Sequence, residues 1–272
     1  MPDRRQVLEF RRAAGFDRSV EWIPMITGLY SAATAMDVAA QRHEVAAENL
    51  ANVQISGFKR RIIPQSTFDE MLRRASSAES PEDNPKSRHL GTASRDVQYD
   101  FTAGSLKQTE RPLDFAISGD GFFQVNGPDG DLFTRNGSFY VNPDGQLVTI
   151  DQLPVMGTGG PITLPAGATS ENIRVTADGR LYSGATEFGQ LKLVEFQDLT
   201  QLQSQGATLF SATPEAGASD AAASVMQGFL ETANVTSVHE LVNLVAISRE
   251  YEAAQKALNT IAESIQRRIG LR

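Results

Sequence analysis

The sequence predicts an α+β protein, with a long helix toward each end of the chain and an all-β domain rich in hairpins between them. The two terminal stretches repeat apolar residues at helical spacing, whereas the middle alternates short apolar runs with Asn-Gly and Asp-Gly pairs. With 272 residues, the chain is long enough for one large domain or two modest ones.

Changes in composition divide the chain into five predicted segments. Met25 follows Pro24 where the helical pattern begins, so a start at Met1 and a start at Met25 both stay open. The segments are a charged arm or mis-assigned start at 1–24, an N-terminal helix and cap at 25–58, a linker at 59–100, a β-rich domain at 101–228 and a C-terminal helix at 229–272. Within the linker, residues 76–94 are rich in Ser, Pro and Glu and are predicted to form a loop.

The N-terminal helix is predicted from apolar and small residues that recur at alternating spacings of three and four. This is a heptad pattern, and its several alanines would let a partner helix approach closely. The lone histidine among them is expected to be a packed polar residue rather than a metal ligand. The predicted seam positions are Leu29, Ala32, Met36, Ala39, His43, Ala46, Leu50 and Val53.

The C-terminal helix is predicted to begin at Ser237, because Glu240 three residues later completes a capping box. Arg267 and Arg268 suit the last turn, where the helix dipole favours positive charge, and Gly270 is the expected stop. The apolar positions are Leu241, Leu244, Ile247, Tyr251, Ala254, Leu258, Ile261, Ile265 and Ile269.

The middle of the chain carries four pairs that favour tight turns. Asn-Gly and Asp-Gly tolerate positive φ, and between short apolar runs they are a strong hairpin signal. They stand at residues 129–130, 136–137, 144–145 and 178–179. We therefore expect a compact domain of short antiparallel strands.

Charge and composition exclude several classes of function. The formal net charge is −8, and residues 95–235 hold 17 acidic against 7 basic residues, so a nucleic-acid partner is not expected. The chain has no cysteine, which excludes disulfides and thiolate metal sites. The longest uncharged stretch near the start, residues 22–36, is too short and too interrupted for membrane insertion or for a cleaved signal peptide.

No constellation of residues points to catalysis. The histidines at 43, 89 and 239 lack metal-ligand spacing, and the glycine-rich residues 157–161 lack the Lys-Ser/Thr of a phosphate-binding loop. We therefore expect no enzyme activity, no cofactor and no metal. The two amphipathic helices instead favour contacts with another helix pair, and heterologous contacts between copies generate rings or filaments.

Three blocks, in order, carry a resemblance to a known family. They read GLYSAATAMDVAAQRHEVAAENLANVQISGFKR, GSLKQTERPLDFAISGDGFFQV and GFLETANVTSVHELVNLVAISREYEAAQKAL. These blocks resemble the rod and hook group of bacterial flagellar axial proteins. The residues that match the family motif are Asn49, Leu50, Ala51, Asn52, Gly57, Phe58, Gly119, Gly121, Phe122, Phe123, Asn234 and Val235.

The resemblance implies a structural subunit of the flagellar basal-body rod, where the rod crosses the periplasm. It implies that the terminal helices form a coiled-coil-like layer through their seams, with the β domain outside. Partners would be other copies of the chain and neighbouring rod and hook proteins. The family also implies delivery by the flagellar type III export apparatus, in an unfolded state and without a cleaved signal.

The motif residues have expected local roles. Asn52 is expected to end the helix with a left-handed cap, Gly57 to turn the chain and Phe58 to be buried. Ile55 stands where the family usually has threonine, which puts one hydrogen bond of that turn in question.

The length favours a rod protein over a hook protein. Residues 153–168 favour the proximal rod protein, while residues 231–245 suit the distal rod protein equally, so the distal type stays the alternative. Two other functions stay open: a secreted enzyme that cuts the cell wall, and a binding module made of the β domain with stalk helices.

Overall fold

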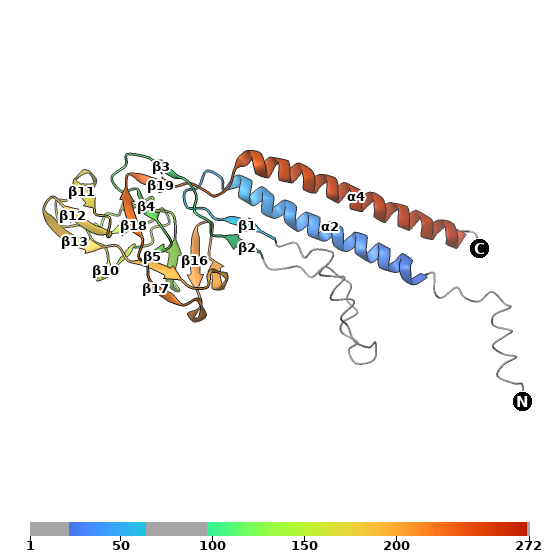
Figure 1. The fold of residues 1–272 in the computed structure, drawn as a ribbon, viewed down its shortest axis with the longest axis horizontal. Helices are drawn as coiled ribbons and strands as arrows, with labels where there is room; N and C mark the ends of the chain where they lie inside the picture. Colours follow the sequence, from blue (N-terminus) through green and yellow to red (C-terminus); the bar gives the residue numbers. More distant parts are fainter. Residues whose placement is uncertain (1–21, 64–96, 271–272) are drawn as a thin grey trace, which may run out of the picture. The chain divides into compact units, whose positions relative to one another are not determined.

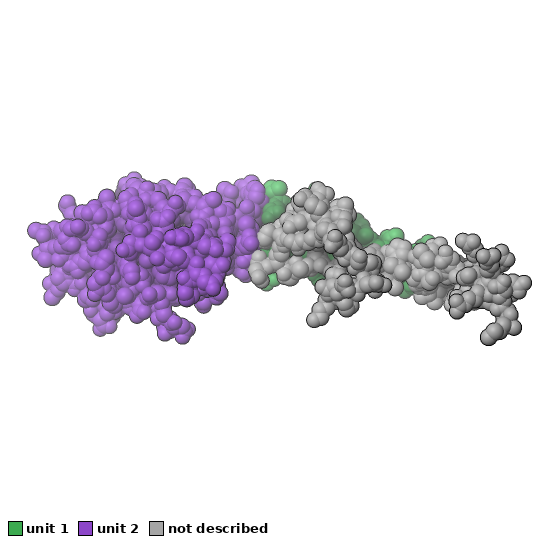
Figure 2. Space-filling model, turned by 60° about the horizontal axis from the view of Figure 1, so that its bottom comes forward, with its two compact units in different colours: residues 1–45, 63–96, 242–272 green, residues 46–62, 97–241 purple. Residues whose placement is uncertain are grey.

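The computed structural model describes residues 22–63 and 97–270. The chain forms two compact units, shown in Figure 2. The described part of unit 1 comprises residues 22–45, 63 and 242–270, and unit 2 comprises residues 46–62 and 97–241. Residues 1–21 of the predicted arm, and the predicted loop at 76–94, lie outside the described residues.

Both predicted helices are present (Figure 1). Helix α2 spans Trp22–Ala51 and helix α4 spans Ser237–Gly270. The predicted start of the first helix at Met25 is wrong, because α2 begins three residues earlier and includes Pro24. Proline is tolerated in a first helical turn, where its missing N–H has no intrahelical acceptor.

The prediction of a coiled-coil-like layer is wrong, although the α+β class holds. The chain has one N-terminal and one C-terminal helix, which run antiparallel in unit 1 and are joined by the Arg42–Glu250 ion pair (Figure 1). Ile247 is buried, but Leu241 and Tyr251 on the same predicted stripe are exposed. Two helices of one chain bury only the faces they turn toward each other, so no continuous buried seam results.

The strands belong to unit 2 and pair antiparallel throughout. Short 3₁₀ turns separate some of them: η2 (Ser170–Asn172), η3 (Leu199–Gln201) and η4 (Pro214–Ala216). The strands are β1 (Arg60–Ile62), β2 (Gln98–Asp100), β3 (Leu106–Gln108), β4 (Phe115–Ser118), β5 (Phe122–Gly127), β6 (Gly130–Thr134), β7 (Tyr140–Val141), β8 (Leu147–Val148), β9 (Met156–Gly157), β10 (Gly160–Pro161), β11 (Ile173–Val175), β12 (Arg180–Ser183), β13 (Thr186–Gln190), β14 (Leu193–Phe196), β15 (Leu202–Ser204), β16 (Leu209–Ala212), β17 (Ala218–Asp220), β18 (Ser224–Gln227) and β19 (Phe229–Glu231).

The largest sheet has six strands in the order β15-β16-β6-β5-β14-β17. Successive side chains of a strand point to opposite faces. Phe122 and Phe123 on β5 therefore enter two different hydrophobic clusters, one on each face of the sheet. The smaller cluster is mostly aromatic, and its Phe122, Phe133, Phe196 and Phe210 rings pack edge-on or tilted.

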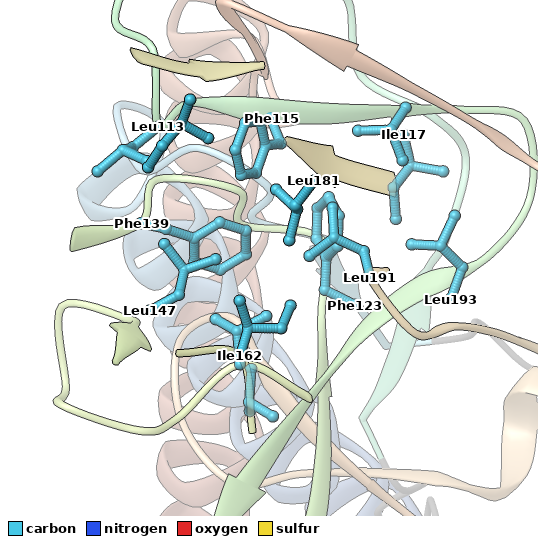
Figure 3. Close-up of a cluster of buried hydrophobic side chains, with 14 residues drawn as sticks. Leu113, Phe115, Ile117, Phe123, Phe139, Leu147, Ile162, Leu181, Leu191 and Leu193 are labelled. Atoms are coloured by element: carbon cyan, nitrogen blue, oxygen red, sulfur yellow. The ribbon is translucent and has the colours of Figure 1, made fainter. Parts of the chain in front are cut away.

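The larger cluster is the main core of unit 2, shown in Figure 3. Leucine, isoleucine, valine and phenylalanine side chains from strands β4, β5, β8, β11, β12, β14 and β18 and from the connecting loops converge there. Phe115, Phe123 and Phe139 are fully buried, and Phe139 contacts the other two rings.

Three of the four predicted hairpins are confirmed. The pairs at 129–130, 144–145 and 178–179 connect β5 to β6, β7 to β8 and β11 to β12. The prediction at 136–137 is wrong, because β6 and β7 do not pair with each other. Gly137 instead lets the backbone of Phe115 approach closely, because a Cβ at residue 137 would lie 1.7 Å from the Phe115 carbonyl oxygen.

Candidate functional site at the junction of the chain ends

The chain leaves α2 and enters α4 through two segments of unit 2 that lie against each other. Gly57 N–H donates to the Glu231 carbonyl (2.8 Å), and Asn234 N–H donates to the Phe58 carbonyl (3.4 Å). We call residues 48–61, 100–104 and 229–240, together with Arg135, the junction. The segments 48–58 and 231–235 hold most of the residues that match the family motif.

A buried carboxylate, Glu231, lies at the centre of the junction. Its Oε1 accepts hydrogen bonds from Lys59 Nζ (2.7 Å) and from the Gly104 N–H (2.9 Å), and its Oε2 accepts one from Arg135 (3.2 Å). The three charged side chains are all at least 95% buried. A buried ion group of this kind holds only while every partner is present, because each charge has lost its water.

The surplus positive charge of this cluster is met by backbone carbonyls. Lys59 also donates to the Thr102 carbonyl (2.9 Å) and the Phe101 carbonyl (3.4 Å), while Arg135 donates to the Gly119 carbonyl (3.0 Å). Burial lowers the pKa of Lys59 from its ordinary value of 10.5, and the neighbouring Glu231 carboxylate opposes that shift.

Three consecutive basic residues bind three different carboxylates. Lys59 pairs with Glu231, and Arg60 pairs with the buried Glu240 in the first turn of α4 (2.8 Å). Arg61 pairs with Glu48 in the last turn of α2. The basic run that follows Gly57-Phe58 therefore holds the end of one helix and the start of the other.

Two asparagines of the motif act through their side-chain amides. The buried Asn49 exchanges two hydrogen bonds with the backbone of Arg61 (2.8 and 2.9 Å). Asn234 accepts from the Arg60 N–H (2.7 Å) and donates to the Asp100 carbonyl (2.7 Å). An amide that both donates and accepts satisfies two backbone groups at once, as neither a carboxylate nor an aliphatic side chain would.

Asn52 differs from its expected role. Its N–H and its side-chain Nδ2 both donate to the Glu48 carbonyl (3.0 and 2.9 Å), but no left-handed cap forms there, because its φ is not positive. The left-handed residue is Gly57, at φ 71°. A Cβ on Gly57 would lie 2.4 Å from the backbone of Arg135, so only glycine fits.

Phe58 is buried in a small cluster of its own with Ala233 and Val235, against Val53 and Ile55. Leu50 is half-buried and Ala51 is exposed. Farther along, Gly119 and Gly121 adopt positive φ before β5, and Gly119 supplies the carbonyl bound by Arg135. Most motif residues thus lie in the junction, whereas Gly121 lies against Ala221 and Phe122 and Phe123 mainly build the two cores.

The predicted helix seams are buried unevenly. Ala39, Ala46 and Ile247 are buried, while His43, Leu241 and Tyr251 are exposed. The remaining seam residues that have a described exposure are half-buried: Leu29, Ala32, Met36, Leu50, Val53, Leu244, Ala254, Leu258, Ile261 and Ile265.

Sequence reasoning missed the charged centre of the junction. Lys59, Arg135 and Glu231 were not singled out, since their partners lie 172 and 96 positions apart in the chain. The only local signal was the run of three basic residues directly after Gly57-Phe58. Glu231 could have been recognised as a charged residue that interrupts apolar residues in the third block of the family resemblance.

The described residues contain no cluster of three or more His, Asp or Glu side chains arranged to hold a metal ion. Among the same residues, no helix combines the length and the apolar character that crossing a membrane requires.

Comparison with known proteins identifies the family. Residues 116–183 match the flagellar hook protein FlgE/F/G D1 domain, and residues 226–271 match the flagellar basal body rod FlgEFG protein C-terminal domain. The chain is 34% identical to the flagellar basal-body rod protein FlgG of Buchnera aphidicola, over 89% of this chain and 98% of that protein.

Two further relatives agree with this result. FlgG of Bacillus subtilis is 30% identical, over 91% of this chain and 100% of that protein. The basal-body rod protein FlgF of Salmonella typhimurium is 32% identical, over 85% and 93%. The chain therefore belongs to the family of flagellar basal-body rod proteins, which are structural components of the flagellum and not enzymes.

Proposed function

We propose that this chain assembles with copies of itself and with neighbouring rod and hook proteins, and that its terminal helices carry those contacts. The observation that supports this most directly is the buried junction. In the junction, the charged and amide side chains hold the end of α2 and the start of α4 in place instead of presenting reactive groups.

The seam residues and the motif residues have separate parts in this proposal. The seams, from Leu29 to Val53 and from Leu241 to Ile265, would supply apolar surface for subunit contacts. The motif residues Asn49, Gly57 and Asn234 would hold the helix ends in place. The half-exposed state of most seam residues in a single chain supports this division.

Removal of either helix tests the proposal. In a flagellated bacterium whose own copy is replaced, deletion of Met25–Val53 or of Ser237–Arg272 should abolish rods in electron micrographs of isolated basal bodies. The full-length chain should co-purify with basal bodies. Normal rods built from either truncated chain would overturn the proposed role of the helices.

We also infer that the chain reaches the rod through the flagellar type III export apparatus, without a cleaved signal. The family membership supports this route. Export should stop when that apparatus is inactivated, and the exported chain should keep its N-terminal residues in mass spectrometry.

For the type of rod protein, we favour the proximal type. Relatives named FlgG and FlgF are both similar to the chain, which is consistent with that type and with the distal alternative. Gold labelling of a tagged chain in isolated basal bodies would locate it at the proximal or the distal part of the rod.

A further inference from the structure

Helices α2 and α4 each carry a second face that the chain itself leaves exposed. On α2 this outward face consists of Asp37, Ala40, Glu44 and Ala47, spaced by three or four residues. On α4 it consists of Val242, Val245, Arg249, Ala253 and Lys256, with the same spacing. Residues so spaced lie on one side of a helix.

The exposed face of α2 lies beside its predicted seam, and that of α4 lies opposite its predicted seam. At about 100° per residue, Ala40 and Ala47 lie about a quarter to a third of a turn from the buried Ala39 and Ala46, and Glu44 lies nearly half a turn from them. Val245 and Arg249 are likewise about half a turn from the buried Ile247. Each of the two helices therefore carries an exposed outward face that is separate from its buried residues.

The valines at the start of the α4 face lack cover. Val242 is 66% and Val245 55% exposed, which is unusual for two neighbouring aliphatic side chains on one helix. The two faces also carry charged residues that have no charged partner in the described part of the chain. Within the described residues, no ion pair involves Arg249 or Lys256 on α4, or Asp37 or Glu44 on α2.

The two faces are complementary when two copies are placed antiparallel. Aligning Arg249 with Glu44 also aligns Lys256 with Asp37 and sets Ala253 against Ala40. The same alignment brings Val245 within one residue of the level of Ala47. Two charge pairs, one close approach of small residues and one apolar contact thus arise from a single register. It lies within one residue of the register that the Arg42–Glu250 pair sets inside one chain.

We propose that the outward face of α4 in one copy docks on the outward face of α2 in a second copy of this chain. This proposal rests on the proposed function, and it specifies which surface of the second copy is bound. Since the two faces differ, the contact is heterologous, so each copy keeps one free face of each kind and addition can continue. The occupant is a second copy because the charges on the two faces are complementary to each other.

Disulfide trapping tests the contact, because the chain has no cysteine of its own. A full-length chain with Ala40→Cys and Ala253→Cys would replace the native copy in cells. Both positions are exposed, and a disulfide needs Cα atoms within about 7 Å. A disulfide within one chain adds no mass, so only a contact between copies gives multimers. Oxidised basal bodies should give a ladder of covalent multimers on a denaturing, non-reducing gel.

The matched control moves one cysteine by a single residue, to the buried face: Ala39→Cys with Ala253→Cys should stay monomeric. A monomer band alone from the Ala40→Cys, Ala253→Cys chain, while that chain is present in basal bodies, would overturn the contact and leave the proposed function standing. Absence of the unaltered chain from basal bodies would instead overturn the proposed function.

A charge exchange provides a second readout that does not depend on oxidation. Glu44→Arg alone or Arg249→Glu alone should reduce assembled rods per cell about tenfold or more, because like charges then meet at the contact. The double exchange should restore them. Unchanged rods in both single variants, or no recovery in the double variant, would contradict the proposal.

Discussion

At the scale of single residues, the junction depends on a few side chains that have no substitute. Glu231 balances Lys59 and Arg135 in a site that water does not reach. Breaking a buried ion group by removing one partner costs far more than removing a surface charge, since the remaining charges are left buried. Among the junction residues, substitution of Glu231 should therefore lower the free energy of unfolding most.

Glu231→Gln should lower the free energy of unfolding by roughly 3–5 kcal/mol, because two buried cations lose the carboxylate that they share. Urea unfolding followed by fluorescence would measure the change. The exposed Glu171 offers a control: Glu171→Gln should stay within about 0.5 kcal/mol of the unaltered chain. Equal effects of the two substitutions would argue against the role assigned to the cluster.

Gly57→Ala should destabilise unit 2 by more than about 1 kcal/mol, because alanine is strained at φ 71° and its Cβ would collide with the Arg135 backbone. Gly159→Ala is the matched control, since a Cβ there meets nothing within 4 Å and its φ is not positive. Thermal unfolding would show a lower midpoint for the first variant alone. A midpoint for Gly57→Ala as high as that of the control would refute the steric argument.

Tyr140 should lose its proton at a lower pH than an ordinary tyrosine. A hydrogen bond from Ser138, then one from Arg111, lowers the pKa of Tyr140 below its ordinary value of 10.0. A lowered pKa means that the unfolded chain holds this proton longer. The contribution of Tyr140 to stability is therefore absent at neutral pH and grows as the pH rises through the folded pKa toward 10.

Ultraviolet absorbance during a base titration would show this early phenol. Tyr140→Phe should remove the early phase, Ser138→Ala should move it toward higher pH, and Tyr182→Phe should leave it in place. An early phase that survives Tyr140→Phe would assign it to another tyrosine.

At the scale of elements, the helices and the strands differ in how well one chain stabilises them. Strand β5 is covered on both faces by apolar clusters. Helix α4 beyond Ile247 has only half-buried and exposed side chains wherever its exposure is described. A helix depends on burying its apolar face, so the half-buried side chains of α4 leave apolar surface for the contacts proposed above.

Hydrogen exchange on the purified chain should follow that difference. Amides of residues 250–266 should exchange much faster than those of β5 and β14, because local opening exposes little buried surface there. Mass spectrometry of peptic fragments would resolve the segments. Equal protection of α4 and β5 would mean that the chain already satisfies its own helices.

At the scale of the whole molecule, the last strand before α4 completes unit 2, which begins at residue 46. Strand β19 pairs with β3, and its Glu231 reaches Lys59 just after α2. We therefore expect unit 2 to need both the segment that follows α2 and the strand β19 that precedes α4.

Two truncations separate these contributions. A chain that ends at Thr236 keeps Glu231, Ala233 and Val235, and should still unfold cooperatively by near-ultraviolet circular dichroism. A chain that ends at Gly228 loses β19 and the carboxylate of the junction, and should lose that cooperative transition. Cooperative unfolding of the shorter chain would show that the domain closes without its last strand.

The sequence by itself determined the α+β class, the two terminal helices, three of the four hairpins and the family. All of these depend on local signals: spacings of three and four along a helix, turn pairs such as Asp129-Gly130, and matched blocks. Residues close in the chain control such features, so they can be seen without a fold.

Only the tertiary structure decided which faces are buried and which charges meet. Asn136-Gly137 has the composition of a hairpin turn, but it lies where Phe115 approaches, and β6 finds other partners. Lys59, Arg135 and Glu231 carry no local mark of burial, because a charge is buried only when distant segments bring its partners within hydrogen-bonding distance. The same holds for the helices: their periodicity predicts an apolar stripe, and the neighbour that covers it is set by packing.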